Sequence, residues 1–166
     1  PWEDLIELGH RFGVPVYPCI RRSSIQAHRG SAEILRAQAL EAWKKGADGI
    51  YLFNLFPGEA YTGIFRELGD PDALERLNKI YSLDPVGRES FGHYIPNFWR
   101  HKAQKPFSSA SPVELQTDRR YQISLYLADR ALEIQDDPGP TLDLRIQAEE
   151  LQGGEAPALV VNGYRL

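Results

Sequence analysis

The sequence predicts an α/β region followed by an all-β region, on three observations. Residues 1–82 alternate apolar stretches of strand length with segments of helical period. Residues 83–117 are rich in proline, serine and aromatic side chains and have no helical period. Between residues 118 and 166 two stretches, 121–127 and 142–148, have apolar residues at every second position, as in half-buried strands. We therefore expect an α/β part over 1–82, a linker and packing segment over 83–117, and an antiparallel β module over 118–166.

Charge and hydrophobicity exclude several classes of partner. The 166 residues carry a formal net charge of −4, with 42% hydrophobic and 25% charged residues, which is typical of a globular protein. A nucleic-acid-binding chain would need a basic face, and no apolar run is long enough to span a bilayer. We expect neither nucleic acid nor a membrane as a partner.

The start of the chain indicates a piece of a longer protein. It begins with Pro1 and contains no methionine, and its first residues have the pattern of a helix already under way. We therefore expect the remaining N-terminal part of the same protein as a partner. The single cysteine, Cys19, excludes an internal disulfide and leaves the compartment undecided.

The first half reads as a βαβ unit. A helix with an apolar stripe ends at Gly13, and the β-branched stretch 14–20 follows as a short strand. A helix over 31–45 has Gly46 at its C′ position, and the strand "GIYLFNLF" follows. Its near-continuous apolar character predicts burial on both faces, as in a parallel sheet covered by helices.

A further helix follows that strand. Asp70 is placed to cap it and Pro71 to occupy its first position. One face of this helix would carry the apolar side chains Leu74, Leu77, Ile80 and Tyr81. Because two parallel strands with one crossover cannot stand alone, residues 1–82 are expected to be the end of a larger α/β array.

The second half predicts antiparallel strands. In 121–127 and 142–148 apolar residues alternate with polar ones, and "DDPGP" and "GGEAP" read as turns. Asn162-Gly163 follows two apolar residues and is a strong hairpin signal. A β-sandwich, incomplete at the C-terminus, is the expected architecture.

Several phrases resemble one family. The stretch "AQALEAWKKGADGIYLFNLF" followed by "FRELGDPDALERLNKIY" resembles the last unit of bacterial glycoside-hydrolase-like TIM-barrel proteins. The stretch "LRIQAEELQGGEAPALVVNGYRL" is similar to the closing strands of the β-sandwich that follows the barrel in that family. The resemblance implies the C-terminal portion of a (β/α)8 barrel, with 14–20 and 49–54 as its seventh and eighth strands, and an appended antiparallel β-sandwich.

The resemblance also implies a function, hydrolysis of glycosidic bonds in a poly- or oligosaccharide. Such enzymes need two carboxylates that flank the scissile bond. The expected seventh strand ends "PCIRRSS", without Asp or Glu, so the acid and the nucleophile would lie in the missing N-terminal part and this chain alone would be inactive. The alternative is a non-catalytic carbohydrate-binding or scaffold protein. The resemblance slightly favours a secreted or periplasmic location.

Four polar residues are candidates for contact with a sugar. Asn54 ends the second strand, where barrel active sites form, and could bind a hydroxyl group or begin a turn. Arg21 and Arg22 follow the first strand and could hold an acidic sugar, or lie in a solvated loop. Glu59 is the one carboxylate in the loop after the second strand, and a solvated loop acid is the alternative.

Aromatic residues near the same strand give weaker candidates. Tyr51, Phe53, Phe56 and Tyr61 could stack on a sugar, although most are expected in the core. In the β module, Tyr121, Tyr126 and Tyr164 could form another platform, with Tyr126 the best placed by its phase.

Neither a metal nor an organic cofactor is expected. The four histidines show no ligand spacing, and "GADG" lies between helix and strand, the wrong order for a dinucleotide-binding loop. Cys19 is expected to be a buried structural residue, since no base lies near it in the sequence.

Overall fold

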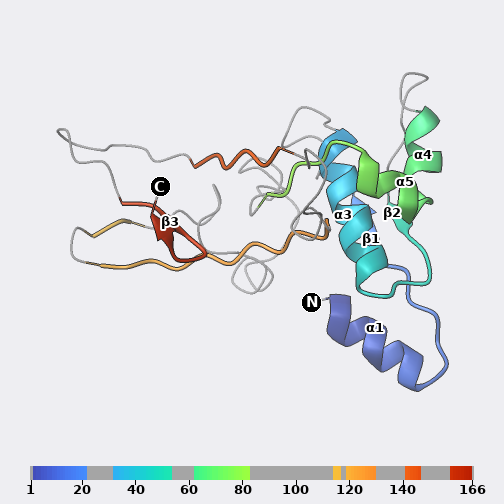
Figure 1. The fold of residues 1–166 in the computed structure, drawn as a ribbon. Coiled ribbons are helices and arrows are strands. Elements are labelled where there is room, and N and C mark those ends of the chain that lie inside the picture. The colour runs from blue at the N-terminus through green and yellow to red at the C-terminus, as the bar shows by residue number, and fades with distance from the viewer. Residues whose placement is uncertain are drawn as a thin grey trace, which may run out of the picture. The chain divides into compact units, whose positions relative to one another are not determined.

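The computed structural model describes residues 2–21, 32–53, 62–82, 114–116, 119–129, 141–146 and 158–165. The chain divides into two compact units, Pro1–Leu132 and Glu133–Leu166. The elements, in chain order and as labelled in Figure 1, are α1 Trp2–Arg11, β1 Cys19–Arg21, α3 Ala32–Lys44, β2 Tyr51–Phe53, α4 Thr62–Leu68, α5 Pro71–Arg76, β3 Val160–Val161 and β4 Tyr164–Arg165. Among these helices none is long and apolar enough to cross a membrane.

Glycine ends α3 where the sequence predicts. Gly46 adopts a positive φ of 84°, which costs a residue without a Cβ little. Its N–H donates to the carbonyl of Trp43 at 2.9 Å, and the N–H of Ala47 donates to the carbonyl of Ala42 at 3.1 Å. These two bonds satisfy the last carbonyls of the helix in a Schellman motif, so the predicted C′ glycine is confirmed.

The predicted start of α5 is also confirmed. The Asp70 side chain accepts a hydrogen bond from the N–H of Ala73 at 3.0 Å, and Pro71 occupies the first helical position. The helix is shorter than predicted and ends at Arg76, so of the predicted apolar face only Leu74 lies within it.

The βαβ unit exists as a two-stranded parallel sheet. β1 pairs with β2 in the register Cys19↔Tyr51, Ile20↔Leu52 and Arg21↔Phe53. The pairing extends toward the N-terminal ends of the strands, where the N–H of Asp48 donates to the carbonyl of Val16 at 3.1 Å. Both strands therefore end at the same edge of the sheet.

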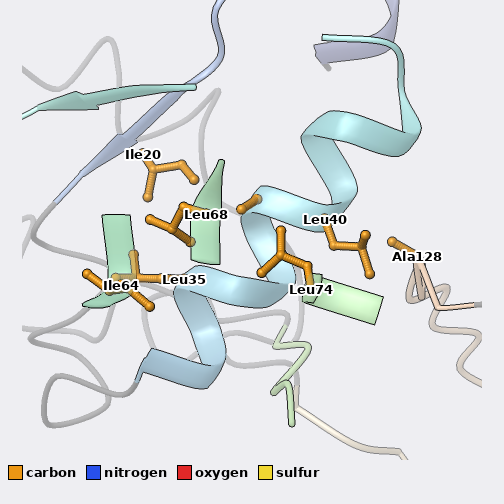
Figure 2. Close-up of a cluster of buried hydrophobic side chains, with 8 residues drawn as sticks. Ile20, Leu35, Leu40, Ile64, Leu68, Leu74 and Ala128 are labelled. Carbon is orange, nitrogen blue, oxygen red and sulfur yellow. The ribbon is translucent and has the colours of Figure 1, made fainter. Parts of the chain in front are cut away.

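The core of the first unit surrounds α3. Helices α4 and α5 lie against α3 and against each other (Figure 1). Figure 2 shows the buried cluster they form with β1, which comprises Ile20, Leu35, Ala39, Leu40, Ile64, Leu68, Leu74 and Ala128. Two polar contacts fix α4 on α3: the Trp43 indole N–H donates to the carbonyl of Leu68 at 2.8 Å, and Arg36 pairs with Glu67 at 2.8 Å.

The predicted fold class, a (β/α)8-barrel portion followed by an antiparallel β-sandwich, is wrong. The described part of the chain holds two sheets of two strands each, and neither a barrel nor a sandwich is formed by it. The segments predicted as strands from their alternation are 121–127 and 142–148. Residues 121–127 and 142–146 belong to no strand, and 147–148 lie outside the described residues. The physical reason is that a half-buried strand needs a partner strand and a covered face, and in 141–146 the side chains of Leu142, Leu144 and Ile146 are all exposed.

The predicted hairpin at the C-terminus is confirmed. Val160 pairs with Arg165 and Val161 with Tyr164 in an antiparallel ladder. Asn162 and Gly163 both have positive φ, as a two-residue type I′ turn requires. The division into 1–82, 83–117 and 118–166 stays a prediction.

Candidate functional site

The residues predicted to contact a sugar follow the ends of β1 and β2. Arg21 is the last residue of β1, and its backbone pairs with that of Phe53, the last residue of β2. The side chain of Arg21 is not among the described parts of the chain. Arg22, Asn54 and Glu59 also lie outside the described residues. The register places the last residues of the two strands, Arg21 and Phe53, side by side.

One face of the parallel sheet is aromatic and exposed, and we call it the outer face. It is formed by Tyr17, Cys19, Tyr51 and Phe53, each of which is exposed. Because side chains alternate along a strand, the intervening Ile20 points to the opposite face, where it is 1% exposed and belongs to the cluster around α3. The sheet is thus buried on one side and open on the other.

Two predictions about this sheet are therefore wrong. The strand at 49–54 was expected to be buried on both faces, but Tyr51 is 53% and Phe53 is 43% exposed. Cys19 was expected to be buried, yet it is exposed. The described helix α3 contacts β1, and nothing described covers the outer face.

The aromatic side chains of the outer face lie close together. The rings of Tyr51 and Phe53 have centroids 6.3 Å apart and planes inclined by 51°. The Tyr17 ring lies over Gly49: a Cβ at that position would come within 2.5 Å of the ring. Tyrosine and phenylalanine rings provide flat apolar surfaces, and the tyrosine hydroxyl adds a hydrogen-bonding group. Such a surface can bind the apolar face of a ring-shaped ligand.

Sequence reasoning did not identify Tyr17 as part of this surface. The signal was present, because residues 17, 19, 49, 51 and 53 have the same parity on two paired strands. Pro15 and Pro18 are unfavourable in a central strand, and they therefore obscure the side-chain alternation of this stretch.

A hydrogen-bonded group formed by His10, Val16 and Asp48 lies at the N-terminal end of the sheet. One carboxylate oxygen of Asp48 accepts the backbone N–H of Val16 at 2.7 Å and lies 2.8 Å from Nε2 of His10. The Val16 N–H and, next, the His10 ring lower the pKa of Asp48 below its usual 3.8. His10 lies in the last turn of α1, so this group joins α1 to the segment that leads into β2.

Among the described residues, no group of three or more His, Cys, Asp or Glu side chains could hold a metal ion. Comparison with protein-family models, with curated proteins and with solved structures gives no significant match.

Proposed function

We propose that the chain binds carbohydrate through the outer face of its parallel sheet. The observation that carries the proposal is the exposed pair Tyr51 and Phe53 on strand β2, flanked by Tyr17. Soluble domains usually bury aromatic side chains of a strand, and exposed apolar clusters commonly mark binding sites. Supporting this, β1 and β2 end at one edge beside this surface.

Polar residues next in the sequence would supply specificity. Asn54 directly follows Phe53, and its amide can both donate to and accept from a sugar hydroxyl group. Arg21 is the last residue of β1, and Arg22 follows it in the sequence. A guanidinium group can pair with a carboxylate through two parallel hydrogen bonds. This favours an acidic sugar over a neutral one. Glu59 is retained as a weaker candidate for a hydroxyl contact.

Hydrolysis is the second candidate, and it rests on the sequence resemblance alone. In that proposal a longer protein containing this chain cleaves the glycosidic bond with carboxylates from its other parts. Glycan release by the longer protein, abolished by removal of two of its carboxylates, would support it. Binding without turnover by that protein would favour a carbohydrate-binding or scaffold role instead.

The test is binding to a panel of neutral and uronic-acid-containing oligosaccharides, followed by calorimetry with the best ligand. Tyr51→Ala and Phe53→Ala should each weaken binding about tenfold, the loss expected when one aromatic contact is removed. Phe65→Ala is the matched control, since Phe65 of α4 is 45% exposed, like Phe53, but does not belong to the outer face. Wild-type affinity of both Tyr51→Ala and Phe53→Ala would refute the proposal.

Cys19 gives an independent readout. It is the single cysteine, is exposed, and pairs in register with Tyr51 on the outer face. A bound sugar should slow alkylation of its thiol by iodoacetamide, and the slowing should disappear in Tyr51→Ala. An unchanged alkylation rate at saturating sugar would place the ligand elsewhere.

Asn54 separates a ligand contact from a turn residue. Asn54→Ala should weaken sugar binding while the melting temperature stays nearly unchanged. Unchanged binding together with a lower melting temperature would make Asn54 a turn residue and remove it from the site.

A further inference from the structure

Residues 126–129, which we call the docked segment, lie against the helices of the first unit although they form neither helix nor strand. Ala128 is 6% exposed and belongs to the cluster around α3. Figure 2 shows it at the edge of this cluster, which also contains Leu40 of α3 and Leu74 of α5. By contrast, Ile123 and Leu125, just before this segment, are exposed. Contact with the helices is thus concentrated in a few residues.

Lys79 provides the charged contact. Its side chain is 4% exposed, and its ammonium lies 2.9 Å from the Asp129 carboxylate. The same ammonium donates to the carbonyls of Leu74 and Leu77 at the end of α5, the second at 2.7 Å. These helix carbonyls hold the lysine in place and leave one N–H for the acid. A nearly buried ammonium requires such a counter-charge, because an unpaired buried charge is costly.

A backbone contact and an aromatic contact complete the interaction. The N–H of Ala128 donates to the hydroxyl of Tyr81 at 3.2 Å. The ammonium of Lys45, on the turn after α3, lies 4.9 Å from the centre of the Tyr126 ring, within the range of a cation–π interaction. Three of these four residues therefore meet the helices: Tyr126 through its ring, Ala128 through its small apolar side chain and its backbone N–H, and Asp129 through its carboxylate.

Burial and the neighbouring Asp129 charge raise the pKa of the Tyr81 hydroxyl, so the group stays protonated. It therefore keeps both its proton to donate and its lone pairs to accept the N–H of an extended chain.

We propose that the surface formed by Leu40, Lys45, Leu74, Lys79 and Tyr81 recognises extended peptides in which a small apolar residue precedes an acidic one. Residues 126–129 occupy this surface as an intramolecular ligand. The acidic residue is the required element, since Lys79 is held for a carboxylate by the end of α5. When residues 126–129 leave this surface, we expect an acidic peptide to bind there. Its four consecutive positions would be an aromatic residue, any residue, a small apolar residue and an acidic residue, as in 126–129.

The binding test uses the whole chain with the docked segment displaced. Ala128→Arg cannot fit the apolar cluster, and Asp129→Lys repels Lys79, so a chain with both changes exposes the surface. A fluorescent peptide of residues 119–132 should bind this variant saturably, by anisotropy. Wild-type chain should bind it at least tenfold more weakly, because its own segment competes at high effective concentration.

Two changes make the test specific. A peptide with Asn in place of Asp129 should bind the displaced variant at least tenfold more weakly than the native peptide. Adding Lys79→Met, which keeps the side-chain volume, should remove binding of the native peptide. Equal binding of both peptides, or none by a displaced variant that keeps its helical circular dichroism and cooperative melting, would overturn the proposal.

Hydrogen exchange on the wild-type chain tests detachment without any substitution. The Ala128 amide should be protected, yet exchange at least a hundredfold faster than the amides of Leu35 and Leu40, since it opens locally while the core stays folded. Protection equal to that of α3 would show that the segment opens only with the core, and full exposure would show that it does not dock. Either result would reject an intramolecular ligand.

Discussion

Helix α3 and residues 141–146 have equally regular apolar patterns, but only one pattern is buried. In α3, Leu35, Ala39 and Leu40 are 1%, 0% and 0% exposed. In 141–146, Leu142, Leu144 and Ile146 are 67%, 51% and 59% exposed. The helix satisfies its own backbone hydrogen bonds and meets β1, α4 and α5, whereas a strand must find its backbone partners in another segment. A periodic apolar pattern thus forms a buried element only where another segment of the chain packs against it.

The largest effect should come from the core of the first unit. Leu40→Ala removes buried methyl groups from a side chain that is fully enclosed, and it should lower the free energy of unfolding by about 2–5 kcal/mol. Leu142→Ala is the control in the exposed pattern and should change it by less than about 0.5 kcal/mol. Urea titration followed by circular dichroism measures both. Equal losses would mean that 141–146 packs as firmly as α3.

Two glycines with nearly the same backbone angle sharpen the comparison. Gly46 after α3 has φ 84°, and Gly163 in the hairpin has φ 89°. A Cβ at either position would meet no described atom closer than 3.9 Å, so alanine tests backbone strain alone. Gly46→Ala should lower the free energy of unfolding of the first unit by about 1–2 kcal/mol. Gly163→Ala should leave that transition unchanged, as seen in the same titration; a matching loss would show that the two units unfold together.

The cap of α5 should contribute less. Asp70→Ala removes the acceptor for the Ala73 N–H and should cost about 1 kcal/mol of stability. Asp70→Asn keeps a side-chain oxygen in place and should stay close to wild type. If thermal melting cannot separate the two variants, the hydrogen bond at 3.0 Å contributes nothing to stability.

The smallest effect should depend on pH. Because the folded pKa of Asp48 lies below its ordinary 3.8, its contribution to stability is present above that value and is lost as pH falls through the folded pKa. Asp48→Asn should therefore melt below wild type at about pH 6, with the difference gone at about pH 2. Asp143→Asn, in the exposed pattern, serves as the control. A difference that persists in acid would point to packing and not to charge.

Local sequence determined the ends of the elements. Gly46 at the end of α3, Asp70 and Pro71 at the start of α5, and the Asn162-Gly163 turn all lie where the sequence predicts. Each depends on a few neighbouring residues and on backbone angles that particular side chains favour. The order strand, helix, strand over the first half was predictable for the same reason.

Tertiary structure decided which apolar faces are covered. The alternation of 17, 19, 51 and 53 is readable in the sequence, but its exposure depends on α3 packing on one side of the sheet. The same holds for Ala128 and Asp129, which follow the predicted strand 121–127 and which the fold places against the helices of the first unit. Periodicity specifies that a face is apolar, and only long-range packing specifies what lies against it.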